Sequence, residues 1–171
     1  DGCDYGFVPG DLADRYFVDV QAEPGFQSAV ALSSNGVAAD TFEVNLWESG
    51  DMGASWDHLG TSPPPDFLGL TLGVAPTDPN RLYITGRDGT EGTREGVVFR
   101  SDDRGETWTR YAVMGGEDGE TLPYMGGVDP NDADTFYVAN IRQEMAEIVY
   151  FGLLVTRDGG ETWEIIFERN K

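Results

Sequence analysis

Short runs of apolar and β-branched residues recur along the whole chain, and turns rich in Gly, Pro, Asp and Asn separate them. Runs of this kind predict short strands. The predicted strands form three groups of four, at 16–22, 27–32, 41–48 and 55–59, at 68–75, 81–86, 96–101 and 107–113, and at 122–128, 135–141, 149–156 and 162–167. Four short antiparallel strands in about 50 residues, three times over, are typical of propeller blades rather than of a sandwich.

Longer polar segments connect the predicted strands. Within the groups they lie at 33–40, 87–95 and 142–148, and between the groups at 60–67 and 114–121. We expect all of them to be loops. The Gln-Glu-Met-Ala-Glu run inside 142–148 is the exception, because it equally favours the start of a helical turn.

Two landmarks recur with nearly the same period. The first reads Ser/Thr-x-Asp-x-Gly-x-Ser/Thr-Trp, and its aspartates, Asp51, Asp103 and Asp158, are 52 and then 55 residues apart. The second is a match between 68–86 and 122–140 at an offset of 54. Two independent landmarks with one period indicate a repeat architecture. The repeat divides the chain into an extension at 1–15 and units at 16–61, 62–114 and 115–171.

The repeated motif has the chemistry of a tight turn. Its aspartate can accept backbone N–H groups, its glycine tolerates a positive φ, and its last Ser or Thr can add a hydroxyl contact. Its tryptophan can bury a large ring against the sheet or the neighbouring unit. We therefore interpret the motif residues as structural: Ser49, Asp51, Gly53, Ser55, Trp56, Ser101, Asp103, Gly105, Thr107, Trp108, Thr156, Asp158, Gly160, Thr162 and Trp163.

Aspartates in turns can also hold a cation or act as catalytic acids. The run 102–106 resembles a cation loop only superficially, because the ligand spacing of an EF-hand is absent. The acidic turn 129–134 aligns with 75–80, which has fewer oxygens and must form the same turn. His58 follows a motif tryptophan by two residues and is expected to be exposed or packed rather than a ligand. We expect neither a metal nor a cofactor.

Charge and composition exclude several classes of function. The chain has 31 Asp and Glu against 11 Lys and Arg, a net charge of −20, which argues against nucleic acid and anionic membranes as partners. No apolar run reaches the roughly 18 residues that span a bilayer, so we expect no membrane insertion. One Cys, Cys3, and one His exclude an internal disulfide and a Cys/His zinc site. Cys3 is either an unpaired thiol or paired with a residue outside this chain.

The motif resembles the Asp-box, or BNR repeat, of sialidases, sortilin-type receptors, xyloglucanase-like glycosidases and the photosystem II assembly factor. The resemblance covers 16–171 and implies an all-β fold of four-stranded antiparallel propeller blades, three of them present. It implies no particular activity, because these families do unrelated things. The Arg-Ile-Pro signature of sialidases is absent. We expect a non-catalytic binding or assembly module, and the alternative is part of a sialidase-like or xyloglucanase-like glycoside hydrolase, with catalytic residues on this or on missing blades.

Binding residues concentrate on loops that a rigid scaffold positions. In a four-stranded meander the longer connections share one end of the blade, opposite the Asp-box turns, and we call this end the loop face. Its candidate binding residues are Arg87, Asp88, Arg94, Glu95, Glu117, Tyr124, Arg142 and Glu144. The alternative interpretation is that these charges only keep the surface soluble. No catalytic set stands out.

Closed propellers have about four to eight blades, so three repeats form only part of a ring. Exposed apolar faces and strand edges tend to find partners. The chain is either a fragment of a longer one, or half of a six-bladed ring formed by two copies, or completed by a strand from 1–10. We expect the remaining blades as partners and a carbohydrate or protein as ligand. Resemblance to mainly extracytoplasmic families, together with the acidic composition, predicts an extracellular, periplasmic or cell-surface location.

Overall fold

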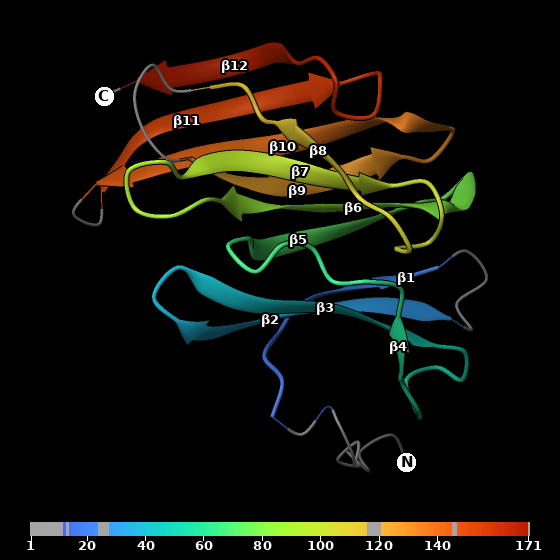
Figure 1. The fold of residues 1–171 in the computed structure, drawn as a ribbon. Helices are drawn as coiled ribbons and strands as arrows, with labels where there is room; N and C mark the ends of the chain where they lie inside the picture. The colour runs from blue at the N-terminus through green and yellow to red at the C-terminus, as the bar shows by residue number, and fades with distance from the viewer. Residues whose placement is uncertain (1–11, 13, 24–27, 116–120, 145–146, 171) are drawn as a thin grey trace, which may run out of the picture.

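The computed structural model describes residues 12, 14–23, 28–115, 121–144 and 147–170. These residues form twelve strands and no helix. The strands make three separate four-stranded antiparallel sheets, each built from four consecutive strands in sequence order. The prediction of an all-β fold made of four-stranded blades is therefore confirmed (Figure 1).

We name the sheets blades 1 to 3 in chain order. Blade 1 contains β1 (Phe17–Ala22), β2 (Ala29–Ala38), β3 (Thr41–Ser49) and β4 (Asp57–Leu59). Blade 2 contains β5 (Leu68–Ala75), β6 (Asp78–Asp88), β7 (Glu95–Ser101) and β8 (Thr109–Ala112). Blade 3 contains β9 (Leu122–Asp129), β10 (Asp132–Glu144), β11 (Glu147–Thr156) and β12 (Glu164–Asn170).

Two connections differ from the sequence-based expectation because the central hairpins are longer. The helical turn that 142–148 equally favoured is absent from its described residues, because Gln143 pairs with Ile148 and Glu144 with Glu147 as β10 and β11 continue. A helix of one turn carries the unfavourable nucleation step without the favourable propagation that a longer helix gains. Extending the existing β-ladder, in contrast, adds a hydrogen-bonded residue pair at each step. Most of the predicted loop 33–40 is likewise strand, because β2 continues to Ala38 along β3.

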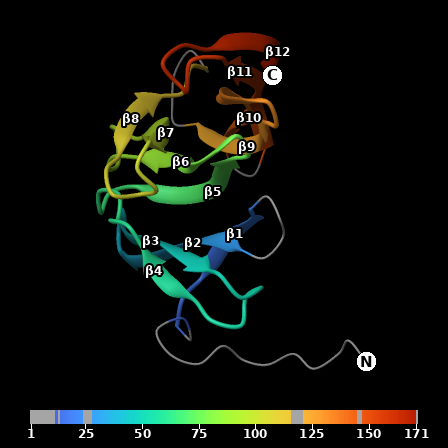
Figure 2. The same ribbon diagram turned by 90° about the vertical axis from the view of Figure 1, so that its right-hand side faces the viewer.

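The blades are stacked side by side, with blade 2 between the other two (Figures 1 and 2). The first strands of the blades are neighbours in space, since β5 contacts both β1 and β9. Two hydrogen bonds join these inner strands. The N–H of Leu72 donates to Asp19 Oδ2 at 2.9 Å, and the N–H of Met125 donates to Thr71 Oγ1 at 2.8 Å. This arrangement is that of a partial propeller, in which β1, β5 and β9 line the axis.

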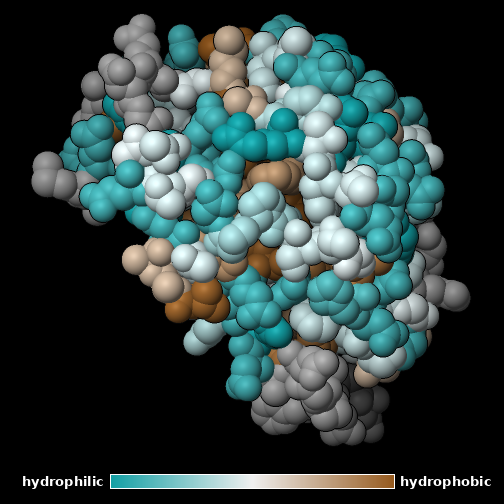
Figure 3. Space-filling model, viewed as in Figure 1, coloured by the Kyte–Doolittle hydropathy of each residue, from teal (hydrophilic) through white to brown (hydrophobic). Residues whose placement is uncertain are grey.

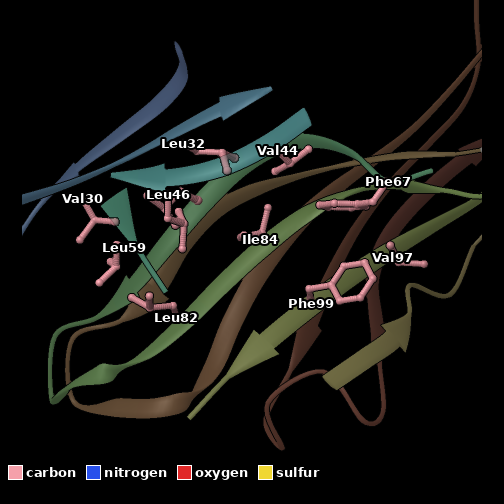
Figure 4. Packing of buried hydrophobic residues seen from close by; sticks show 11 residues of the cluster. Val30, Leu32, Val44, Leu46, Leu59, Phe67, Leu82, Ile84, Val97 and Phe99 are labelled. Carbon is pink, nitrogen blue, oxygen red and sulfur yellow. The ribbon is translucent and has the colours of Figure 1, made fainter. Parts of the chain in front are cut away.

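The hydrophobic core lies between the blades as well as within them. One cluster joins blade 1 to blade 2 and includes Val30, Leu46, Ile84 and Phe99 (Figure 4). A second cluster joins blade 2 to blade 3, where the rings of Tyr83 and Phe136 lie 4.4 Å apart. Burial of apolar area therefore holds neighbouring blades together. The described residues include no helix of the length and apolarity that crossing a membrane requires.

Candidate functional site

The three Asp-boxes form the same hydrogen-bonded turn. In the second box, Asp103 Oδ1 accepts the N–H of Thr107 at 2.8 Å, and Oδ2 accepts its hydroxyl at 2.6 Å. Ser101 Oγ accepts the N–H of Gly105 at 2.7 Å and donates to Asp103 at 2.8 Å. The first and third boxes repeat these contacts. The first Ser or Thr is thus the hub of each turn, a role that the sequence motif by itself did not show.

The box glycines and aspartates have the geometry expected of a structural turn. Gly53, Gly105 and Gly160 have φ values of 86°, 90° and 101°, a region that favours glycine. Hydrogen bonds, led by the Thr107 hydroxyl, lower the pKa of Asp103. Burial by itself would raise the pKa of Asp158, but its hydrogen bonds from the box bring it below the ordinary value.

Such carboxylates are poorly suited to catalysis or to binding a cation. Their oxygens already accept donors from their own turn, so few lone pairs remain for a ligand. Among the residues that the structure describes, no group of three or more His, Cys, Asp or Glu side chains could hold a metal ion. The carboxylate of each box is held by hydrogen bonds within its own turn.

The tryptophans of the second and third boxes connect consecutive blades. Trp108 Nε1 donates to the carbonyl of Thr61, at the end of blade 1, at 2.8 Å. Trp163 Nε1 donates to the carbonyl of Ala112 in blade 2 at 3.0 Å. Trp56 instead donates to Gly53 in its own turn at 3.2 Å. Each of the later boxes is therefore also an interface with the preceding blade.

The position before the box glycine makes a second contact between blades. Arg104, at this position in box 2, donates from Nη1 to Glu23 at 2.8 Å and from Nη2 to Glu48 at 3.0 Å. The Glu23 side chain is only 8% exposed, and the hydrogen bond from Arg104 lowers its pKa. Sequence reasoning missed this ion pair because Arg104 occupies a variable position of the motif.

The candidate residues of the loop face fall into separate groups rather than one site. Arg94 donates to Asp40 Oδ1 at 3.1 Å, and Arg87 Nη2 lies 4.0 Å from the same oxygen. Arg142 and Glu144 lie 3.6 Å apart at the end of β10. Tyr124, on β9, is 36% exposed.

Asp88 and Glu95 form another group, in which both side chains accept hydrogen bonds from Arg110, at 2.5 Å and 2.6 Å. Arg110 and Asp40 were not among the predicted site residues. Arg110 lies on β8, an outer strand, whereas the prediction of binding residues considered mainly the loops. Asp40 lay inside a predicted loop. The sequence signal that could have identified it is the presence of Arg87 and Arg94 in the corresponding loop of the next blade, since both approach Asp40.

The remaining predictions concern isolated residues. His58 is exposed, as expected; its ring packs edge-on against Trp47 and its Nε2 lies 3.2 Å from Asn45 Oδ1. Glu117, Cys3 and the segment 1–10 lie outside the described residues.

A groove of about 910 Å³ runs between blades 2 and 3. Its described lining comes from the β6–β7 loop, the segment after β8 and the third Asp-box, and it includes Arg94, Glu95, Met114, Thr121 and Trp163. Two of the predicted candidates, Arg94 and Glu95, thus line the same groove as Trp163 and the exposed Met114. Mixed polar and apolar lining of this kind suits a ligand with hydroxyl or amide groups.

Comparison with known proteins supports the fold. No model of a known protein family matches the sequence. Over 99 residues, 54% of this chain, it is 32% identical to the xyloglucanase Xgh74A of Acetivibrio thermocellus. The matched region is 11% of that relative, so the chain corresponds to a small part of its length.

Solved structures with this fold have diverse functions. A xyloglucanase of family GH74 from Xanthomonas campestris covers 88% of the chain with a TM-score of 0.59 at 15% identity, over 21% of its own chain. YCF48 bound to a D1 peptide covers 88% with a TM-score of 0.51 at 15% identity, over 40% of its own chain. A β-fructofuranosidase from Schwanniomyces occidentalis covers 96% with a TM-score of 0.63 at 12% identity, over 36% of its own chain. With the three boxes, these similarities show that the chain has the fold of an Asp-box β-propeller.

Proposed function

We propose that this chain is a non-catalytic, extracytoplasmic binding module and that the groove between blades 2 and 3 receives a carbohydrate or a segment of a protein. The observation that carries the proposal is that carboxylates of the loop face accept hydrogen bonds from neighbouring arginines. Asp88 and Glu95 are both engaged by Arg110, and Asp40 is engaged by Arg94. A general acid or base needs an oxygen free to meet the substrate. These carboxylates are instead engaged by arginines, an arrangement that suits binding better than proton transfer.

The similarity to different functional classes supports both kinds of ligand. The xyloglucanases act on a polysaccharide, as their name states, and YCF48 was solved with a peptide. The groove lining contains the donors and acceptors that recognise hydroxyl groups or backbone amides alike.

A glycoside hydrolase is the second candidate function. It is favoured by the 32% identity to xyloglucanase Xgh74A over 99 residues. Such an enzyme needs two carboxyl groups that flank the scissile bond at roughly 5 to 9.5 Å. In this second candidate, the catalytic pair includes a carboxylate on a blade beyond the three described.

Binding assays on this chain, and turnover assays on a longer protein that supplies the further blades, decide between the candidates. We expect immobilised xyloglucan oligosaccharides or an unstructured peptide library to retain the chain, with no release of reducing sugar or fluorophore from xyloglucan, β-glucan or sialoside substrates. Met114→Arg, in the groove, should abolish retention. Met52→Arg is the matched control, because Met52 is an exposed methionine outside the groove lining. Turnover that a single carboxylate substitution removes would favour the hydrolase, and equal retention of both variants would exclude the groove.

The extracytoplasmic location has its own test. The acidic composition, with one lysine, Lys171, supports it. We expect the natural precursor to be exported, which fractionation of the source cells with an antibody against this chain would measure. Recovery in the cytosol would contradict the proposal.

A further inference from the structure

The two boundaries between neighbouring blades, which we call seams, are closed in different ways where the outer strand ends. In the seam between blades 1 and 2, Thr61 follows β4 and binds the second box directly. Its N–H donates to the carbonyl of Gly105 at 2.8 Å, and its hydroxyl donates to the carbonyl of Glu106 at 2.9 Å. Gly60, just before it, has a φ of 63°, and a Cβ there would lie 2.3 Å from the Gly105 carbonyl oxygen. A stretch of the chain itself therefore fills this seam.

The seam between blades 2 and 3 lacks this contact in the part of the chain that the structure describes. The outer strands β4 and β8 pair in the same register relative to their boxes, so Ala112 is the counterpart of Gly60. Alanine disfavours a positive φ. The chain instead continues along β7, where the N–H of Val113 donates to the carbonyl of Gly96 at 2.8 Å. The groove of about 910 Å³ remains between this segment and the third box.

The edge of β8 that faces the groove presents backbone N–H groups. Successive residues of an antiparallel strand direct their N–H and C=O groups to opposite sides. Val113 faces β7, so Ala112 and Met114 face the groove, which both residues line. Blade 3 already uses their carbonyls, because Ala112 accepts from Trp163 Nε1 at 3.0 Å and Met114 accepts from Asn140 Nδ2 at 3.2 Å. Their two N–H groups remain as donors, without an acceptor among the described residues.

These donors lie in an open part of the groove. Ala112 is exposed, and Met114 is 52% exposed. Glu161 and Thr162, on the wall formed by the third box, are exposed as well. On the side of the molecule where β8 lies in front in Figure 1, Figure 3 shows small apolar areas among hydrophilic residues. A ligand with mixed side chains can therefore reach both walls without displacing a buried residue.

The groups that remain available favour a protein segment over a carbohydrate. The described lining offers no open aromatic platform for a sugar ring, because Trp163 packs edge-on against Phe136, with 5.4 Å between the ring centres, and belongs to the core between the blades. Two N–H groups two residues apart on one strand edge lie about 7 Å from each other, the interval at which an extended peptide presents its carbonyls. Pairing of this kind adds a peptide to the edge of a sheet.

We propose that the groove binds an extended segment of another protein, which adds to the edge of β8 and accepts hydrogen bonds from the N–H groups of Ala112 and Met114. A Ser or Thr of that segment donates its hydroxyl to the carbonyl of Glu161, as Thr61 does to Glu106 in the other seam. The Glu161 carboxylate is 56% exposed, which disfavours an acidic segment. The inference rests on the proposed binding function and selects a protein over a carbohydrate as the ligand.

Peptide binding to variants of Ala112 tests this pairing. The probe is the member of the unstructured peptide library that the wild-type chain retains most strongly, labelled with fluorescein. Ala112→Pro removes one N–H at an edge position, where a strand tolerates proline. We expect it to raise the Kd of the probe about tenfold, the loss of roughly one hydrogen bond, in fluorescence polarisation. Ala112→Ser is the matched control, because it keeps the N–H and should leave the Kd unchanged.

Hydrogen exchange on the wild-type chain gives a second measurement that does not depend on the folding of Ala112→Pro. Saturation with the probe should slow the amide exchange of Ala112 and Met114 by about tenfold or more. Val113 should not change, because its N–H is already bonded to Gly96. The retained peptides should also be rich in Ser and Thr and poor in Asp and Glu.

The outcomes separate this inference from the proposed function. Equal Kd values for the wild type and Ala112→Pro, or unchanged exchange at both Ala112 and Met114, would overturn the pairing while the binding function stands. Retention of xyloglucan oligosaccharides but of no peptide would also overturn it, because the ligand would then be a carbohydrate. Retention of neither would contradict the proposed function, and the inference with it.

Discussion

The first Asp-box and the second have the same internal turn but different surroundings. Ser49 and Ser101 are both buried, and each accepts the N–H of its box glycine, at 2.8 Å and 2.7 Å. Trp108, however, packs on the core between blades 1 and 2, whereas Trp56 bonds within its own turn. The comparison separates two roles of one motif. The turn is encoded locally, and the contact with another blade depends on what lies beside the box.

The residue before the box glycine shows the same contrast. Arg104 is partly buried and joins two carboxylates of blade 1, whereas Met52 at the equivalent position is 80% exposed. Both have a positive φ, 60° for Met52 and 57° for Arg104, so the backbone is alike. Only the neighbouring blade gives this position an energetic role.

Removal of the tryptophans should give the largest difference between the two boxes. We expect Trp108→Ala to lower the free energy of unfolding by about 3 kcal/mol, because it removes a large ring from the inter-blade core. Trp56→Ala should lower it by about 1 kcal/mol or less, since Trp56 contacts one exposed ring, Phe17. Urea unfolding followed by circular dichroism measures both. Equal losses would refute the distinction between the boxes.

Removal of the hub hydroxyls should, in contrast, affect both boxes alike. We expect Ser49→Ala and Ser101→Ala each to cost about 1 to 3 kcal/mol, because each leaves the N–H of a box glycine, part-buried in the first box and buried in the second, without its acceptor. The same urea titration is the measurement. A loss in Ser101→Ala alone would mean that the turn depends on the neighbouring blade after all.

Replacement of Arg104 should have a smaller effect that depends on pH. The pKa of Glu23 is below its ordinary value of 4.5, chiefly through the hydrogen bond from Arg104. A lowered folded-state pKa gives stability that is present above the ordinary pKa and is lost as the pH falls through the folded-state value. We expect Arg104→Met to cost about 1 kcal/mol at pH 7, a cost that shrinks as the pH falls from about 5 to 3.

The control for Arg104→Met is Met52→Ala, at the same position of the first box. Its stability should follow that of the wild type at every pH. Urea midpoints between pH 3 and 7 give the comparison. A difference between Arg104→Met and the wild type that persists unchanged at pH 3 would show that Glu23 is not the partner that matters.

A chelator should have the smallest effect, and the same one on both boxes. A bound Ca²⁺ takes about six to eight oxygens, whereas each box gathers a single carboxylate whose oxygens accept bonds from its own turn. We expect EDTA to leave the Tm of the wild type and of Asp103→Ala unshifted. Differential scanning fluorimetry tests this. A chelator-dependent loss of Tm that disappears in Asp103→Ala would establish a cation in the box.

The sequence by itself determined the strands and the turns, because both depend on neighbouring residues. The prediction of 68–75 coincides with β5, and that of 122–128 matches β9 to within one residue. The box motif implied the turn that Asp103 and Gly105 form, because its hydrogen bonds span at most four residues. Where the local signal misled, at 142–148, the pairing of β10 with β11 outweighed a weak helical preference.

Only the tertiary structure decided which charges meet and which faces are covered. Arg104 reaches Glu23 across 81 residues of sequence, and Arg94 reaches Asp40 across 54. These contacts follow from how one blade is placed against the next, which no local pattern specifies. The same placement buries Tyr83 and leaves Tyr137 exposed, although the two residues occupy matching positions of the repeat. A repeat in the sequence fixes the shape of each blade, and burial at each face depends on the neighbour that packs against it.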